Sequence, residues 1–464
     1  MIRINKIKLI NNKIFGNINI DFTENGKIFD NIVLAGINGS GKTKLLENIY
    51  YLITHKITEY RENFLEPNYS GECAELEMNI EDLNYFADNS KREKIEKCCI
   101  KIRIANSNTY STDTKFFTND REVGLSCVNE YGNRVNSIPT LKSYYSSVDI
   151  NYIPRNNING VTNRKLDDEK NMNTSDIAGD IIQLFIDICT QDAHDLSEWV
   201  DNNKDKVPPD EIKHVRMSRF IKAFDGMFKG EIKFKKISNN SIPIFEKNGK
   251  DVEITSLSSG EKQIIFRGAS ILKNINILKG NPIFIDEPEI SMHPMWQQRI
   301  LSYYKDLIKD ENGNQASQLF IATHSEHILK SSLESDNDII IKLKDNLFDK
   351  FYKGGIGKIL PTITLAEIKY SIFDINTIDF HILLYSYIHN NIVNVDRMHG
   401  SIKSIDDWFL NNNCRLLKNY TYVNYTYQTL PTYIRNCIDH PDSTYAYSEE
   451  ELSKSIKYMV SIIT

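Results

Sequence analysis

A glycine-rich loop carries the sharpest chemical signal in this chain of 464 residues. It follows an apolar run, opens a stretch of helical spacing, and matches the GxxxxGK[ST] pattern of a phosphate-binding loop. Its glycines would let backbone N–H groups surround phosphate oxygens, and the helix N-terminus would add partial positive charge. We expect Lys42 to reach the β- and γ-phosphates and the Thr43 hydroxyl to ligate Mg²⁺. The loop consists of Gly36, Ile37, Asn38, Gly39, Ser40, Gly41, Lys42 and Thr43.

Two adjacent carboxylates, Asp286 and Glu287, end a second apolar run that begins at Pro282. Carboxylates at the end of a buried strand are costly unless a cation sits beside them, so their position favours a function. We expect Asp286 to hold Mg²⁺, directly or through one of its other ligands. Glu287 would then polarise the attacking water.

Two further segments could complete a triphosphate site. Leu257 to Gln263 is a Ser/Gly loop before a helical stretch, and Ser258 and Gly260 would offer a hydroxyl and backbone N–H groups to an anion. Ser-Ser-Gly is also a common turn, so this loop is weak by itself. A third apolar run, Ile321 to Thr323, ends at His324, whose ring could hydrogen-bond a γ-phosphate.

The composition excludes several classes of protein. The chain has 56 Lys and Arg against 62 Asp and Glu, a formal charge of −6, so it is not a wholly basic nucleic-acid coat protein, although a local basic groove remains possible. Its seven cysteines are scattered without a CxxC pair, which excludes a zinc ribbon and disfavours a secreted disulfide framework. No apolar stretch is long enough to span a membrane and the N-terminus lacks a signal-peptide pattern. We therefore expect a cytoplasmic protein with no membrane partner.

The positions of these motifs imply how the chain is organised. Short apolar and alternating runs dominate the first part, while Ile181–Val200 and Glu211–Phe228 have helical spacing. After about residue 250 tight strand–helix alternation returns, and the last portion is mainly helical, with Ser448 and Glu451 forming an expected capping box. The expected parts are a first α/β part at 1–160, a helical insertion at 161–250, a second α/β part at 251–355 and a helical C-terminal domain at 356–464.

The four motifs, in this order, resemble those of the ABC-type ATPases of the SMC, RecF and OLD superfamily: Walker A, signature, Walker B and switch histidine. The resemblance covers about residues 1–60 and 250–330 and implies an α/β, P-loop ATPase head that uses ATP and Mg²⁺. In that family two heads dimerise head to tail, so Ser258 and Gly260 would contact the nucleotide of the other copy. The run from Glu287 to Pro294 resembles the EPExxLHP form of RecF-like and OLD-like ATPases. The sequence departs from the pattern in its LSSGE signature and in lacking a Q-loop glutamine, whose place Tyr152–Arg155 occupies.

A third group of chemical residues, Arg435, Asn436 and His440, lies near the end of the chain. The arrangement resembles the RxxxxH motif of HEPN ribonucleases, and the layout resembles the PrrC and RloC nucleases. His440 suits proton transfer at a 2′-OH, Arg435 suits stabilisation of a phosphorane, and Asn436 would orient one of them. A structural Arg–Asn–His network in a docking domain is the alternative. Four nearby tyrosines could stack on unpaired bases or form a packed edge, namely Tyr420, Tyr422, Tyr425 and Tyr427.

The resemblances leave three functions open. The first is an ATP-gated dimer of an anti-phage defence protein that cleaves RNA with its own HEPN-like domain, without metal. The second is a PtuA-like ATPase sensor that regulates a separately encoded nuclease subunit, and the third is a RecF-like ATPase of DNA repair. The TOPRIM domain of OLD nucleases is not expected, because Asp336, Asp338 and Asp345 fall in a polar stretch that indicates a solvated loop.

Overall fold

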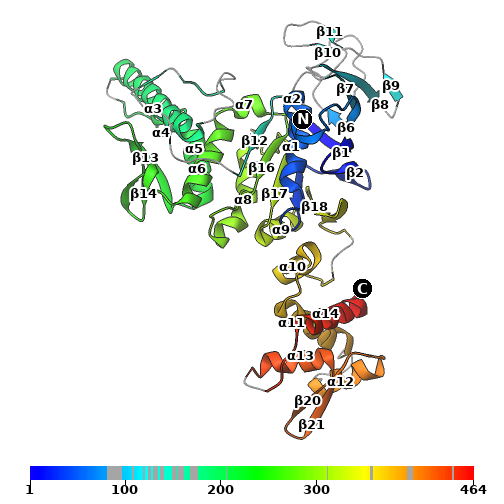
Figure 1. The fold of residues 1–464 in the computed structure, drawn as a ribbon. Helices are drawn as coiled ribbons and strands as arrows, with labels where there is room; N and C mark the ends of the chain where they lie inside the picture. The colour runs from blue at the N-terminus through cyan, green and yellow to red at the C-terminus, as the bar shows by residue number, and fades with distance from the viewer. Residues whose placement is uncertain are drawn as a thin grey trace. The chain divides into compact units, whose positions relative to one another are not determined.

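The chain forms two compact units, Met1–Lys350 and Phe351–Thr464, in the computed structural model (Figure 1). Each unit is described by itself below. Of the segment expected in place of the Q-loop, only Pro154 is among the described residues. The structure describes residues 1–80, 97–106, 109–118, 121–123, 127–128, 134–135, 141–148, 154, 161–162, 164–167, 176–204, 206–310, 312–355, 359–393, 401–441 and 444–464.

A six-stranded sheet forms the centre of the first unit, and its first five strands pair in parallel. Its middle strands are apolar and buried along their whole length, as expected for parallel strands covered on both faces. Figure 1 shows how segments far apart in the sequence lie side by side in this sheet. In spatial order the strands are β12 (Tyr144–Ser146), β16 (Ile283–Asp286), β17 (Leu319–Thr323), β5 (Asn31–Ala35), β18 (Asp338–Lys344) and β19 (Leu347–Tyr352).

A second six-stranded sheet is antiparallel and carries the N-terminus. Ile2, Ile4, Ile7 and Leu9 are buried in the core, in agreement with the alternating runs expected in the first part of the chain. Its strands, in spatial order, are β2 (Gly16–Asp21), β1 (Ile2–Asn12), β6 (Gly71–Ile80), β7 (Lys97–Asn106), β8 (Thr109–Thr118) and β9 (Arg121–Val123). Two short pairs accompany it, β3 (Thr23–Glu24) with β4 (Lys27–Ile28) and β10 (Cys127–Val128) with β11 (Arg134–Val135).

Helices accompany the parallel sheet, and three of them follow its strands β5, β16 and β17 in the chain. The first of them packs against β16 and β17, and the last packs against β5 and β18. These helices are α1 (Lys42–Ile53), α2 (Ile57–Phe64), α6 (Ser259–Leu272), α7 (Ile275–Leu278), α8 (Pro294–Leu307) and α9 (Glu326–Leu333).

The insertion differs from the expected helical segment in two ways. The predicted helix over Glu211–Phe228 is wrong as a single element, because it breaks at His214–Met217. In addition, a three-stranded antiparallel sheet follows, whose second turn is Asn248-Gly249 with φ of 53° and 73°. An Asn-Gly pair supplies both positive φ angles of a tight hairpin turn, so the sequence carried this signal. The elements are α3 (Ile177–Asn202), α4 (Asp210–Lys213), α5 (Ser218–Phe228), β13 (Ile232–Ile237), β14 (Pro243–Lys247), β15 (Lys250–Glu253) and the 3₁₀ turn Ile254–Ser256.

The second unit is mainly helical, with one hairpin. The capping box of Ser448 and Glu451 is confirmed at the start of its last helix, which buries Leu452, Ile456 and Met459. On the hairpin, Tyr420 is buried while Tyr422 is exposed. The elements are α10 (Leu365–Phe373), α11 (Ile378–Ile388), the π-helical turn His389–Val393, α12 (Ile402–Asn411), β20 (Leu417–Tyr422), β21 (Tyr425–Thr429), α13 (Leu430–Asp439) and α14 (Glu449–Ile463).

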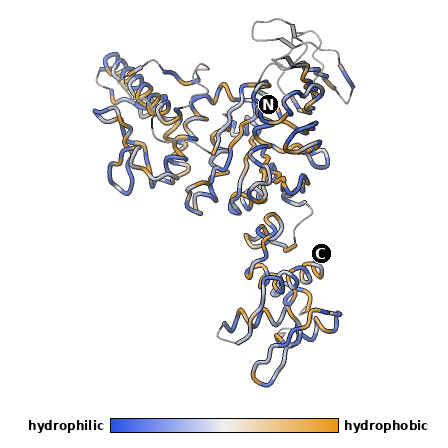
Figure 2. The backbone as a smooth tube through the Cα atoms, viewed as in Figure 1, coloured by the Kyte–Doolittle hydropathy of each residue, from blue (hydrophilic) through white to orange (hydrophobic). Residues whose placement is uncertain are grey.

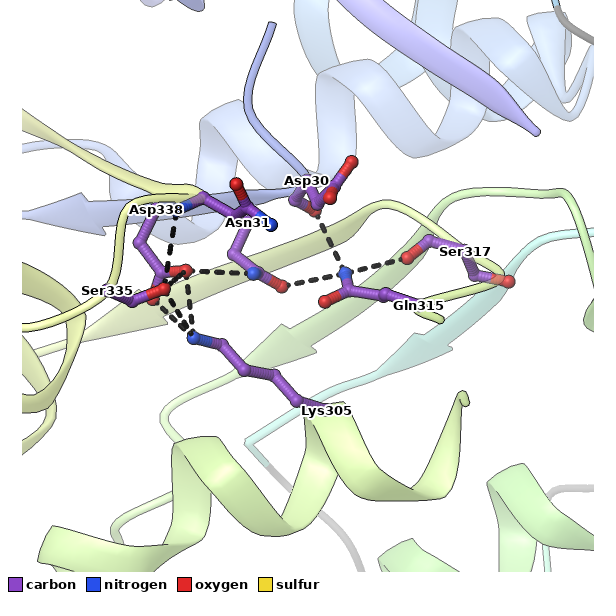
Figure 3. Close-up of polar contacts among 8 residues, drawn as sticks. Asp30, Asn31, Lys305, Gln315, Ser317, Ser335 and Asp338 are labelled. Carbon is purple, nitrogen blue, oxygen red and sulfur yellow. Dashed lines mark hydrogen bonds and ion pairs between the residues drawn. The ribbon is translucent and has the colours of Figure 1, made fainter. Parts of the chain in front are cut away.

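The solvated-loop prediction is wrong for Asp338, which is buried at the start of β18 (Figure 3). Its carboxylate accepts two hydrogen bonds from Lys305 Nζ, at 2.8 and 2.6 Å. It also accepts one from Asn31 Nδ2 at 2.9 Å and one from Ser335 Oγ at 2.8 Å. This network compensates the buried charge at the amino ends of β5 and β18. Asp336 and Asp345 are exposed, as expected.

None of the described helices is both long and apolar enough to cross a membrane. Figure 2 agrees, since the colour along the tube changes repeatedly between hydrophobic and hydrophilic.

Candidate nucleotide site

The phosphate-binding loop joins β5 to α1, at the carboxyl edge of the parallel sheet where ligands bind in open α/β folds. Two of its glycines are required by close neighbours. A Cβ at Gly36, with φ of 150°, would lie 2.5 Å from the carbonyl oxygen of Leu343. One at Gly41, with φ of 94°, would lie 2.8 Å from the Phe15 ring. The loop is thus shaped by packing as well as by any ligand, while Asn38 and Gly39 are exposed at its tip and Ser40 is half-buried.

The Lys42 side chain is folded into this loop. Its Nζ donates to the carbonyl oxygens of Gly36 at 3.0 Å and Ile37 at 3.1 Å. Burial lowers the pKa of Lys42 to about 8, against the opposing effect of Glu287 and Asp286. A bound polyphosphate would add negative charge next to this amine and favour its protonated form.

Asp286 ends β16 as a buried carboxylate that lacks compensation. Its side chain is 1% exposed, and neither oxygen has a hydrogen-bond partner by geometry among the described residues. Burial raises the pKa of Asp286 to about 6, and the nearby Thr43 hydroxyl acts in the opposite direction. An orphaned carboxylate beside a threonine hydroxyl fits Mg²⁺, which binds through one or two protein oxygens together with phosphates and water. The predicted pair of metal ligands therefore lies together.

Glu287 and His324 face each other across the ends of β16 and β17. Glu287 Oε1 lies 3.4 Å from His324 Nε2, and both side chains remain about a quarter exposed, at 26% and 28%. Burial lowers the pKa of His324, Lys42 lowers it further, and Glu287 opposes both. His324 is therefore neutral at pH 7, with one ring nitrogen able to accept a hydrogen bond and the other able to donate one.

Glu289 holds this pair in place, a role that the sequence analysis missed. Its buried Oε1 accepts hydrogen bonds from Thr323 Oγ1 at 2.7 Å and from the backbone N–H of His324 at 2.6 Å. The loop that carries Glu287 is thereby tied to the strand end that carries His324. The signal was present in the sequence as the second acid of Glu287-Pro288-Glu289.

The signature loop begins α6 as predicted. Ser258 is its exposed N-cap, in a capping box with Glu261, and Glu261 Oε1 lies 2.6 Å from Lys247 Nζ. Gly260 is buried, and a Cβ there would lie 2.4 Å from the carbonyl oxygen of Ser291. Packing within the same chain therefore explains Gly260, while Ser258 is accessible to a partner.

Arg267 is a second residue that the sequence analysis missed. It is fully buried on α6, and its guanidinium donates to the carbonyl oxygen of Asp286 at 2.8 Å and to that of Ser147 at 2.9 Å. An arginine inside the apolar run Ile264–Leu272 was the available signal. It links the helix of the signature loop to the strand that ends at Asp286.

A cavity of about 260 Å³ adjoins the phosphate-binding loop. Ile14 and Phe15, which follow β1, line one side of it, and Asp345 and Asn346, which follow β18, line another. Its position fits the nucleoside part of a nucleotide whose phosphates lie in the loop.

The C-terminal residues form their own arrangement in the second unit. Arg435 pairs with Asp439 at 2.5 Å and donates to Asn436 Oδ1 at 3.0 Å. His440 is exposed just after α13, and its ring stacks on Tyr422 at 4.8 Å between centroids. Arg435 and Asn436 are thus brought together. The backbone N–H of His440 donates to the carbonyl oxygen of Asn436 at 3.0 Å, whereas no side-chain hydrogen bond within the described residues joins the His440 ring to either residue.

The parallel sheet brings the residues of this candidate nucleotide site to one edge: Lys42 and Thr43, two adjacent acids and a histidine lie at the carboxyl ends of its strands. A family profile described as "AAA ATPase domain" matches residues 162–329, which include the signature, both acids and His324.

Two known proteins and one solved structure are similar to parts of the chain. Over 63 residues the chain is 44% identical to endonuclease GajA of Bacillus cereus, covering 13% of this chain and 9% of GajA. Over 106 residues it is 33% identical to the retron Vc95 probable ATPase of Vibrio cholerae, covering 21% of this chain and 20% of that protein. These matches span only a small part of each relative. The SMC head domain from Thermotoga maritima is a structural neighbour with 14% identity and a TM-score of 0.36, covering 76% of this chain and all of that domain.

Proposed function

We propose that this protein is a Mg²⁺-dependent ATPase that serves as a nucleotide-controlled switch in defence against phage. The observation that carries the ATPase proposal is the uncompensated Asp286 carboxylate beside the Thr43 hydroxyl, next to the phosphate-binding loop. The retron ATPase and GajA matches support the setting in defence.

Each residue of the site has a distinct role in this proposal. Lys42 leaves the carbonyls of the loop to contact the β- and γ-phosphates, while Thr43 and Asp286 hold Mg²⁺. The metal supplies charge neutralisation at the phosphates. Glu287 accepts a proton from the attacking water, and His324 donates a hydrogen bond to the γ-phosphate.

We infer that hydrolysis requires a head-to-tail pair of heads. Ser258 is exposed at the N-terminus of α6, where a hydroxyl and backbone N–H groups can meet the γ-phosphate bound by a second copy. The Glu287→Gln variant should accumulate this dimer with ATP, and Ser258→Arg added to it should keep the protein monomeric. Light scattering after size exclusion measures both. A monomer in Glu287→Gln with saturating ATP contradicts the pairing.

The ATPase proposal is tested with purified protein, by phosphate release with and without Mg²⁺. We expect turnover that EDTA abolishes and that Asp286→Asn lowers at least about 100-fold. The matched control is Asp338→Asn, at the opposite end of the same sheet, assayed under conditions in which it remains folded. Turnover by Asp286→Asn that equals the parent rate refutes the assigned metal ligand.

The C-terminal unit is a second candidate site, for metal-independent RNA cleavage. The observation in its favour is that His440 is exposed and stacked on Tyr422, where it can reach a nucleic-acid strand. Arg435 would stabilise the phosphorane after exchanging Asp439 for the phosphate, and Asn436 would position it. Incubation of total RNA with the protein and ATP in EDTA-free buffer, with His440→Ala as the variant and His389→Ala as the control, tests this role. Unchanged cleavage by His440→Ala removes the assignment. Co-purification of a separate nuclease, with no cleavage by this chain alone, favours the sensor function instead.

A further inference from the structure

A cleft of about 470 Å³ lies between α5, α8 and the end of α6, away from the residues of the nucleotide site. The helices that form it pack directly on one another, with Phe228 of α5 edge-to-face on Trp296 of α8 at 5.6 Å. Met227, Leu272 and Leu307 lie beneath it and are almost fully buried. Apolar surface makes up the larger share of the exposed lining, and charged side chains carry much of the remainder.

The charge of the cleft is opposite to that of the protein. Four basic side chains line it in a chain whose formal charge is −6. The single acid of the lining, Asp306, is 2.6 Å from Lys309 and thus already paired. The basic residues are Arg219, Lys222, Lys229 and Arg299.

Most of this positive charge is not compensated by the protein. Lys222, Lys229 and Arg299 form no ion pair within the described part of the chain. Moreover, Nη1 of Arg299 is buried and has no hydrogen-bond partner there. Arg219 is the exception, since it lies 3.3 Å from Asp167 and donates to the carbonyl oxygen of Leu272 at 2.9 Å. That bond satisfies a carbonyl oxygen in the last turn of α6, where the partial negative charge of the helix C-terminus would otherwise repel an anion.

Gly226 is an independent indication of a ligand. It lies in the last turn of α5 and lines the cleft, although glycine within a helix costs up to about 0.5–1 kcal/mol relative to alanine. Packing does not require it, because a Cβ at Gly226 would meet no atom within 4 Å. The missing side chain leaves room for a ligand to approach the backbone of α5.

Basic residues lie on one face of α5 and at its C-terminal end. At 100° per residue, Arg219, Lys222 and Gly226 fall within about 60° of one another around the helix. Lys229 caps the C-terminus of α5 and lines the same cleft. We propose that this cleft binds successive phosphates of a nucleic-acid strand, with Lys222, Lys229 and Arg299 as the contacts.

The cleft is connected to the nucleotide site by two of its walls. α6 starts at the signature loop and α8 starts just after the Glu287–His293 segment. A strand that draws α5 toward α8 therefore acts on helices whose first turns adjoin the ATP site. Binding itself does not rest on the proposed ATPase activity; only this coupling does.

The experiment measures fluorescence anisotropy of labelled 15-nucleotide single strands of DNA and RNA with the full-length protein, from 50 to 200 mM salt. Lys222→Gln/Lys229→Gln removes two phosphate contacts, so the slope of log K against log salt should fall by about 1.4 and the affinity about 20-fold at 0.1 M salt. Lys233→Gln/Lys236→Gln, on the exposed part of β13, is the control with the same charge change and should bind as the parent does. Gly226→Gln should also weaken binding, without any change of charge and with a better helix former than glycine.

Further arms separate other ligands and the ATPase. Tripolyphosphate and poly-glutamate are tested as probes in place of the strands. The proposal is overturned if Lys222→Gln/Lys229→Gln and Lys233→Gln/Lys236→Gln bind the strands with equal affinity. It is also overturned if tripolyphosphate or poly-glutamate binds these two variants with different affinities while the strands bind both alike. Lys42→Ala should bind the strands normally, so loss of ATPase activity and loss of strand binding remain distinguishable. Stimulation of ATP hydrolysis by the strand in the parent, absent in Lys222→Gln/Lys229→Gln, supports the coupling.

Discussion

The Asp286→Asn variant should be more stable than the parent when no metal or nucleotide is present. The reason is that Asp286 is 1% exposed and uncompensated, so that its pKa is about 6 rather than the ordinary 3.8. At about 1.36 kcal/mol per pKa unit, this difference corresponds to roughly 3 kcal/mol. An amide removes the buried charge, and the expected gain in the free energy of unfolding at pH 8 is up to that amount.

The pH dependence of this stability difference follows from the linkage between protonation and folding. Because the folded pKa lies above the unfolded value, the native state binds more protons between about pH 4 and pH 6. The parent therefore loses stability as the pH rises through this range, and the loss is complete above it. The advantage of Asp286→Asn should be full at pH 8 and absent near pH 4.

The assay is urea denaturation in EDTA, followed by the fluorescence of Trp199 and Trp296 in a Trp408→Phe background, so that only the first unit reports. Asp338→Asn is the matched control, since it makes the same change in a buried aspartate that is compensated by Lys305 and by two other hydrogen bonds, from Asn31 and Ser335. Removing one partner of such a pair should cost about 3 kcal/mol. The reasoning is refuted if Asp286→Asn also destabilises the protein at pH 8, or if its gain persists at pH 4.

Four further outcomes are expected. Lys42→Ala should abolish ATP binding in isothermal titration calorimetry, and heat of binding equal to the parent's would contradict its role. Glu287→Gln should bind ATP but lower steady-state hydrolysis by about 10² to 10⁴-fold, and equal hydrolysis would exclude Glu287 as the base. Gly260→Ala should lower the free energy of unfolding by about 1–3 kcal/mol, since its Cβ would lie 2.4 Å from the carbonyl oxygen of Ser291. An unchanged free energy of unfolding would show that the backbone at Ser291 moves to accommodate the methyl group. Gly226→Ala adds a Cβ with no atom within 4 Å and should instead raise the free energy of unfolding by up to about 0.5–1 kcal/mol. A lower free energy of unfolding would contradict the conclusion that packing of α5 does not require a glycine.

The sequence predicted that the motifs of the candidate nucleotide site would lie close together, because each motif is local and stands at the end of an apolar strand. Parallel strands bring such ends to one edge, so Lys42, Asp286 and His324 meet although they are far apart in the chain. Glu289 and Arg267 were not predicted, because their roles depend on contacts across strands and helices that no spacing rule specifies. Their only local signals were an arginine inside an apolar run, for Arg267, and a second acid shortly after Glu287, for Glu289.

For other features, predictions from the local sequence pattern were wrong or incomplete. Asp338 follows a run of polar residues and resembles a loop, and only its distant partners Lys305 and Asn31 make a buried position tolerable. The hairpin at Asn248-Gly249 was missed for a different reason, since its turn signal was present but outweighed by the helical spacing before it. The break of the helix between α4 and α5 has no proline or glycine at His214–Met217 to announce it.

The two ends of the parallel sheet differ in how a buried carboxylate is compensated. At one end Lys305 pairs with Asp338 and Asn31 donates a hydrogen bond to it, whereas at the other end Asp286 would be compensated by the proposed cation. In the proposed function, binding of metal and nucleotide compensates Asp286 and raises the free energy of unfolding of the first unit. In a cell depleted of ATP, the empty form should open more often and be degraded by proteases sooner, so that the lifetime of the protein reports the energy state of its host.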